Sequence, residues 1–168
     1  AGSYVDSGLL TDEAKTSWAT QVGLTKDQWA VSAMVNLKYN GWIDEYFSTA
    51  GGDDRPGNST NYGLRAWWRP ADSGTATPEV SFGYDYSVVD GYSTNDTTDM
   101  FFVGLTWLDT FNPDDRIGVA FGQPQMRENT GAEPFMYEVY YGFKVNDSIT
   151  VTPAIFGATN ANGTDGED

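Results

Sequence analysis

The stretch from Trp29 to Tyr39 alternates apolar residues with small or polar ones over the length of a whole strand. Its odd positions are apolar, with an aromatic residue at each end, and its even positions are mostly small or polar, ending with Lys38. This period-two pattern predicts a β-strand with one apolar face. Ten residue steps of about 3.3 Å, tilted by about 45°, span roughly 23 Å, which is close to the apolar height of an outer-membrane β-barrel.

Seven further segments carry the same alternation, which predicts an all-β chain without a convincing helix. The predicted strands besides Trp29–Tyr39 are Ser17–Thr25, Tyr62–Arg69, Glu79–Tyr86, Asp99–Trp107, Arg116–Gly122, Phe135–Lys144 and Ile149–Ala158. Pro153 interrupts the last segment and predicts a bulge or an edge there, because proline cannot donate a ladder hydrogen bond. Short turns alternate with mostly longer connections, an asymmetry typical of antiparallel up-and-down outer-membrane barrels.

The charged residues of these strands are predicted to share the face that carries the small residues. Those on this face are Lys38, Arg65, Arg69, Glu79, Asp85, Arg116, Glu138 and Lys144. In a transmembrane barrel this face lines the pore, because Arg or Lys facing lipid costs about 2–4 kcal/mol at the midplane. In a soluble β-sandwich the assignment reverses, so that the apolar face is the core and the charged face meets solvent.

Strand length and aromatic placement favour the transmembrane barrel, with membrane lipids around it. Sandwich strands usually have about five or six residues, and most of the predicted strands are longer. Tyr and Trp are enriched where a protein crosses the membrane–water interfaces. The residues predicted to form a lipid-facing aromatic girdle are Trp29, Tyr39, Trp68, Tyr84, Trp107, Tyr137 and Tyr141.

The composition of the 168-residue chain, taken as one domain over residues 1–168, excludes several classes of function. It has no Cys and no His, so it lacks disulfides, thiolate metal sites and the commonest general base and metal ligand. We therefore expect no enzyme, no bound metal and no cofactor. The net charge of −15, from 24 acids and 9 bases, argues against a nucleic-acid partner, because phosphate binding needs clustered Lys and Arg.

Four segments resemble cyanobacterial outer-membrane porins of the OprB-like, carbohydrate-selective porin family. They are Tyr62–Pro70, Met100–Trp107, Asp114–Pro124 and Glu138–Pro153. The resemblance covers most of the chain from about Ser17 onward. It implies a barrel of about sixteen strands, a homotrimer, and a location in the outer membrane of a Gram-negative-type bacterium, a cyanobacterium. It also implies passive diffusion of small hydrophilic solutes or inorganic ions.

The chain departs from that family in its length. Eight predicted strands are half of such a barrel, and the N-terminal S-layer homology domain of the cyanobacterial members is absent. Residues 160–168 have the composition of an outer loop, whereas porin chains usually end in a strand with a terminal aromatic residue. We therefore expect a C-terminal-half fragment. The alternative is a complete eight-stranded barrel, whose interior would be filled by side chains.

Two groups of residues are candidates for controlling passage. The bases among the predicted pore-lining residues form a possible ladder that attracts anions or orients solutes, or they pair with Glu79, Asp85 and Glu138 and only solvate the wall. Asp44, Glu45 and Tyr46 could form a constriction if their long loop folds inward, although an exposed outer loop is the simpler interpretation. Adjacent acids such as Asp114 and Asp115 do not flank a substrate as glycosidase carboxylates do.

Two other functions remain open at the level of sequence. A soluble β-sandwich could recognise carbohydrate through Trp and Tyr. A plugged barrel could serve as a structural outer-membrane protein or a surface receptor, with the long loops active. Solubility without detergent separates the first from a porin, and channel conductance separates the second.

Overall fold

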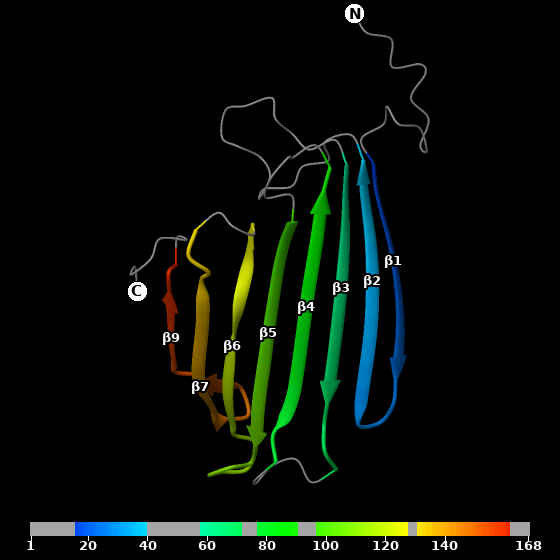
Figure 1. Cartoon of the computed structure of the whole chain (residues 1–168). Coiled ribbons are helices and arrows are strands. Elements are labelled where there is room, and N and C mark those ends of the chain that lie inside the picture. Colours follow the sequence, from blue (N-terminus) through cyan, green and yellow to red (C-terminus); the bar gives the residue numbers. More distant parts are fainter. Residues whose placement is uncertain (1–15, 40–57, 72–76, 91–96, 128–130, 162–168) are drawn as a thin grey trace, which may run out of the picture.

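The computed structural model describes residues 16–39, 58–71, 77–90, 97–127 and 131–161, and this part of the chain is all-β (Figure 1). The strands are β1 (Thr16–Thr25), β2 (Trp29–Tyr39), β3 (Asn58–Trp68), β4 (Glu79–Val89), β5 (Thr97–Leu108), β6 (Arg116–Arg127), β7 (Phe135–Asn146), β8 (Ile149–Val151) and β9 (Ala154–Thr159). They form an antiparallel sheet in up-and-down order, in which β8 and β9 both pair with β7. The prediction of an all-β, up-and-down antiparallel arrangement is confirmed.

The strands extend further into the longer connections than the apolar pattern predicts. β3 begins at Asn58 rather than Tyr62, and β6 continues to Arg127 rather than ending at Gly122. The register between β5 and β6 shifts near one end of the ladder. Phe101 pairs with Gln123 and Asp99 pairs with Met126, so β6 has one more residue than β5 over this interval and forms a β-bulge. The bulge accommodates the proline at position 124, which otherwise would remove a ladder hydrogen bond.

The last predicted strand is two strands, so nine are described where about eight were expected. β8 and β9 are separated at Thr152 and Pro153, and the backbone N–H of Tyr141 donates to the Pro153 carbonyl at 3.1 Å. β9 lies at the edge of the sheet, with β7 as its described neighbour. The prediction that Pro153 marks a bulge or an edge is confirmed.

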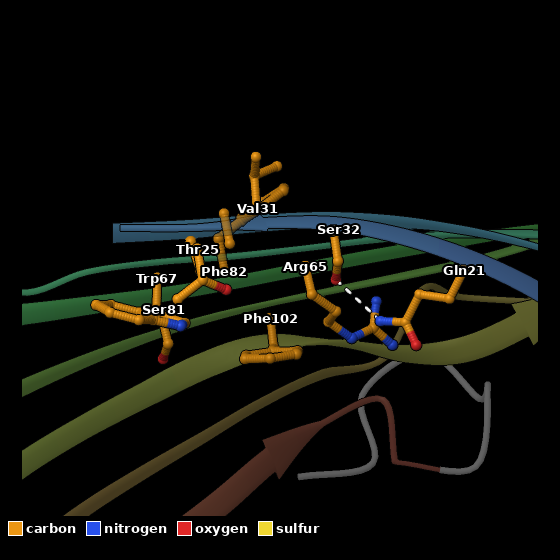
Figure 2. Close-up of a pocket in the computed structure, with 12 residues that line it drawn as sticks. Gln21, Thr25, Val31, Ser32, Arg65, Trp67, Ser81, Phe82 and Phe102 are labelled. Atoms are coloured by element: carbon orange, nitrogen blue, oxygen red, sulfur yellow. Dashed lines mark hydrogen bonds between the residues drawn. The ribbon is translucent and has the colours of Figure 1, made fainter. Parts of the chain in front are cut away.

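The two faces of the sheet differ in exposure, and the apolar face is the more exposed one. In Figure 2, Val31 and Ser32 point to opposite sides of β2, and the C-terminal strands pass below the side with Ser32. Val31 is 38% exposed and Val35 is 40% exposed, whereas the intervening Ser32 and Met34 are half-buried. We call the side of Val31 the apolar face and the side of Ser32 the polar face. Figure 2 shows the sheet curving toward the side of Ser32, so the side chains of the polar face lie closer together and are more buried.

Across the apolar face, apolar residues that are register partners on neighbouring strands form continuous rows. One row, from β2 to β9, is Trp29, Trp68, Val80, Leu105, Val119, Val139 and Ile155. The next row, from β1 to β7, is Leu24, Val31, Ala66, Phe82, Val103, Phe121 and Tyr137. Aromatic and β-branched cross-strand pairs of this kind stabilise the sheet by about 0.2–1 kcal/mol each.

The strands are also staggered in one direction. The row that begins at Trp29, the first residue of β2, meets Val139 of β7; counted from Asn146, the end of β7 that lies on the same side of the sheet as Trp29, Val139 is the eighth residue. From β1 to β9 the offset is about one residue per strand, which inclines the strands by roughly 35° for the usual rise and spacing. Closed barrels have strand tilts of about 35–45°.

The described strands make a single layer, and side-chain burial is concentrated at its two ends. Ser59, Ser87, Val89 and Thr98 are buried on the polar face at one end of β3, β4 and β5, and Asp115 is buried at the other end. Among the described residues, β1 pairs with β2 alone and β9 with β7 alone, so closure into a barrel is not seen. No helix in the described ranges is long and apolar enough to cross a membrane.

Candidate functional site

The polar face of β1 to β5 contains a hollow of about 590 Å³ (Figure 2). The side chains that reach it from the polar face are Gln21, Thr25, Ser32, Arg65, Trp67, Ser81 and Phe102. The ring of Phe102 lies over Gly83, its cross-strand neighbour, where an added Cβ would be 2.1 Å from the ring. A flat aromatic ring on a glycine keeps the strand covered without filling the hollow.

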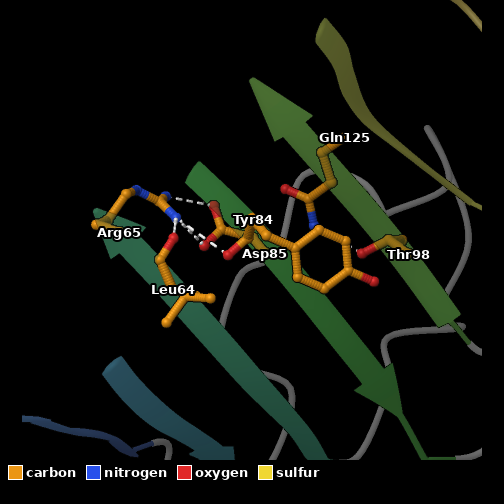
Figure 3. A network of polar contacts seen from close by, with 6 residues as sticks. All are labelled: Leu64, Arg65, Tyr84, Asp85, Thr98 and Gln125. Atoms are coloured by element: carbon orange, nitrogen blue, oxygen red, sulfur yellow. Dashed lines mark hydrogen bonds and ion pairs between the residues drawn. The ribbon is translucent and has the colours of Figure 1, made fainter. Parts of the chain in front are cut away.

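The centre of this face holds a bidentate ion pair between Arg65 on β3 and Asp85 on β4 (Figure 3). The guanidinium donates to the two carboxylate oxygens at 2.8 and 2.6 Å. It also donates to the carbonyls of Leu64 at 2.8 Å and Tyr84 at 3.1 Å, and it lies 5.8 Å from the ring centroid of Phe102. The adjacent carboxylate thus neutralises the charge of Arg65, which reduces its attraction for a free anion.

Arg69 and Lys144, two further bases of the predicted ladder, also have acidic or aromatic neighbours. Arg69 forms an ion pair with Glu79 at 2.5 Å and lies 5.5 Å from the ring centroid of Trp67. Lys144 pairs with Asp114 at 2.9 Å, a partner that the sequence did not suggest. Lys38 also has an interaction partner. The pairing of Arg65 with Asp85 and of Arg69 with Glu79 follows the second interpretation, in which the charges of the wall neutralise one another.

Arg116 and Glu138 differ from the other predicted pore-lining residues. Both are exposed on the polar face of β6 and β7, where Arg116 lies opposite Gly142 and Glu138 lies opposite Ala120. Within the described parts of the chain, neither side chain takes part in an ion pair or hydrogen bond.

The turn between β5 and β6 is organised around the buried side chain of Asp115, which is 1% exposed. Its carboxylate accepts hydrogen bonds from the N–H groups of Thr110, Phe111 and Asn112 at 2.7, 3.0 and 2.9 Å, and from the hydroxyl of Tyr141 at 2.9 Å. Burial raises the pKa of Asp115, but these hydrogen bonds to the charged form outweigh it, so the pKa lies below its ordinary value. This residue joins the turn to β7, and sequence reasoning assigned it no such role.

The residues of the predicted aromatic girdle occupy apolar-face positions of their strands. Trp29 pairs with Trp68 at the end of the sheet where the turns are short, and Trp107 and Tyr141 lie toward the same end. Tyr39 ends β2 and Tyr137 lies near the start of β7, toward the opposite end. Tyr84 is the exception, because it occupies the centre of β4. The ring of Tyr141 stacks on Phe143, and its hydroxyl reaches the Asp115 turn.

One sequence prediction fails at Asp99, and another concerns residues outside the described ranges. Asp99 lies on the apolar face of β5, against the expectation that charges share the polar face; it sits beside the bulge, where the amide of Gln123 donates to it at 3.3 Å. Asp44, Glu45 and Tyr46, the candidate constriction, lie outside the described residues. Across the described ranges, no three His, Cys, Asp or Glu residues are grouped so that they could hold a metal ion.

The chain is similar to an uncharacterized protein of Nostoc sp. (strain PCC 7120), with 32% identity over 109 residues. The match covers 61% of this chain and 18% of the Nostoc protein. The matched region is therefore less than a fifth of the length of that relative. No protein-family model matches the chain. No solved structure matches it either.

Proposed function

We propose that this chain forms part of the wall of an outer-membrane porin, through which small hydrophilic solutes or inorganic ions diffuse passively. The observation that carries the proposal is the exposed apolar face, which runs in unbroken rows across the sheet and is less buried than the polar face. Soluble proteins rarely leave so large an apolar surface uncovered. A bilayer is the solvent that such a face matches, while the polar face meets water in the pore.

The edges of the sheet support continuation into a barrel. Each strand from β2 to β7 carries at least one charged residue, but β1, β8 and β9 carry none. Sheets that end in water often protect their edges with charges, which both of these edges lack, although Pro153 lies between β8 and β9 at the C-terminal edge. Trp18 and Val22 on β1 and Ile155 on β9 are 60%, 72% and 76% exposed, so the apolar rows do not fade toward the edges. Further antiparallel strands beside β1 and β9 would satisfy both edges and close the barrel.

The lining fits an aqueous pore of weak charge selectivity. Although the chain carries a net charge of −15, the principal charges of the polar face are balanced in the pairs Arg65–Asp85 and Arg69–Glu79. The hollow on this face is also lined by amide, hydroxyl and aromatic side chains, such as Gln21, Ser32 and Trp67. Where the charges are paired in this way, hydrophilic molecules pass without being held through an unbalanced charge; the exposed Arg116 and Glu138 are the charges of this face without an ion pair among the described residues. The resemblance to cyanobacterial porins and the similarity to a Nostoc protein support the proposal that this barrel belongs to the outer membrane of a cyanobacterium.

The soluble sandwich is less well supported, because it needs a second sheet against the apolar face and the described strands make one layer. A plugged structural barrel or receptor shares the exposed apolar face with a porin. The distinction between these two rests on conductance, since a plugged barrel inserts in the membrane without opening a path for ions.

The test is reconstitution of the full chain, purified in detergent, into a planar lipid bilayer. A porin gives stepwise increases in conductance, and detergent buffer alone gives none. Membrane insertion without conductance would indicate the plugged barrel. A monomer that stays soluble without detergent and gives no conductance would overturn the assignment to the membrane altogether.

A further inference from the structure

The polar face carries a second hollow, over β6, whose chemistry differs from that of the first. Its volume is about 380 Å³. The floor is low because β6 presents the small residues Ala120 and Gly122 in its middle, whereas the strands on both sides present larger side chains. Those flanking side chains are Met100, Phe102, Met136, Glu138 and Phe156. The result is a groove along β6 with apolar walls and one carboxylate.

The strand register explains why the groove is there. Gly122 lies opposite Phe102 on one side and Met136 on the other. The next residue of this face, Ala120, lies opposite Glu138, which in turn pairs with Phe156 of β9. Gly122 cannot carry a side chain in this backbone, because its Cβ would be 2.1 Å from the carbonyl oxygen of Phe101. The close approach of β5 and β6 therefore keeps the floor empty.

The carboxylate in this groove is not neutralised by the described protein. Asp85 and Glu79, the acids of β4 on the polar face, are each paired with an arginine, but Glu138 is exposed and has no ion pair or hydrogen bond to any described residue. A negative charge among aromatic and thioether side chains complements a ligand that combines a cation with an apolar body. Aromatic faces attract such cations, and methionine adapts to ligands of varied shape.

We propose that the groove over β6 binds small organic cations, in which an ammonium group faces Glu138 and an apolar or aromatic body lies on Ala120 and Gly122 between Phe102 and Met136. Only the consequence for transport rests on the proposed function: in a porin, this groove would retain organic cations longer than inorganic ions. Binding itself requires the folded sheet and not a conducting pore.

The experiment is a calorimetric titration of the full chain in detergent with benzyltrimethylammonium. Glu138→Gln should weaken binding about five-fold, the size expected for one solvent-accessible ion pair. Ala120→Leu should abolish binding, because it fills the floor and leaves the charge in place. Glu79→Gln is the matched control, since it removes an acid of the same face that is already paired with Arg69, and it should leave the affinity unchanged. Far-UV circular dichroism verifies that each variant keeps its β-structure.

The inference is wrong if Glu79→Gln and Glu138→Gln weaken binding equally, which would indicate general attraction of counter-ions. It is also wrong if benzenesulfonate binds as tightly, or if tetramethylammonium, which lacks the aromatic body, does. A chain that binds through Glu138 but gives no conductance would refute the porin and leave the groove intact. A conducting chain that does not bind benzyltrimethylammonium would refute the cation-binding groove and leave the porin proposal standing.

Discussion

An arginine placed on either face at the centre of β2 tests which face meets lipid. Met34 is the middle residue of this eleven-residue strand and lies on the polar face, and Val35 is its neighbour on the apolar face. We expect Val35→Arg to lower the free energy of unfolding in lipid vesicles by about 2–4 kcal/mol, the cost of arginine at the bilayer midplane. This corresponds to roughly a 30- to 700-fold change in the folding equilibrium.

The structure offers the two arginines different surroundings. At position 35 the flanking cross-strand residues are Thr20 and Tyr62, and neither supplies a negative charge. At position 34 the neighbour on β3 is Gly63, and beyond it lies Asp85, so a guanidinium at position 34 has a carboxylate within reach. We therefore expect Met34→Arg to change stability by no more than about 1 kcal/mol, within the usual range for a substitution at an accessible site.

The assay is urea unfolding of both variants in vesicles, followed by tryptophan fluorescence, with the wild type alongside. In a soluble sheet, Val35 is a surface position where arginine costs no more than about 0.5 kcal/mol. Equal stability of the two variants in vesicles, or a larger loss for Met34→Arg, would refute the assignment of the apolar face to lipid.

Two further predictions concern local structure. Because the pKa of Asp115 is lowered by folding, its carboxylate stabilises the protein above the ordinary Asp pKa of about 3.9, and this contribution is lost as the pH falls through the lowered pKa. The urea midpoints of wild type and Asp115→Asn should thus differ by a constant amount between pH 5 and 7 and converge below about pH 4; a difference that grows on acidification would contradict the assigned hydrogen bonds. Gly122→Ala should destabilise by about 1–3 kcal/mol because its Cβ meets backbone atoms of β5, whereas Gly142→Ala meets the flexible Arg116 side chain at 3.2 Å and should cost less in the same denaturation assay.

The alternation of the sequence was sufficient to locate the strands but not their ends. Trp29–Tyr39 matches β2 at both ends, because its apolar positions continue to the last residue. β3 begins at Asn58, in a polar stretch that reads as a loop, and β6 runs through the proline at position 124 by means of a bulge. Backbone ladders continue wherever the neighbouring strand is extended, and that information is not in the local pattern.

The sequence predicts on which face of the sheet the charged residues lie, but it does not predict all of the residues with which they pair. The shared face of Arg65 and Asp85 follows from alternation, and their pairing follows once β3 and β4 are neighbours. The pair Lys144–Asp114 joins residues that are far apart in the sequence, and the groove at Glu138 depends on small residues of β6 lying between two bulky strands. Both require the register of three strands, which period-two patterns do not specify.

The absence of charge on β1 and β9 has a consequence for the behaviour of the folded sheet in water. Bare, apolar edge strands pair with any extended segment they meet, including those of other copies. Until both edges have neighbours, a folded sheet of this kind is adhesive in water. In the proposed barrel each edge is protected only once it has a neighbouring strand, so edge pairing and membrane insertion would have to occur together.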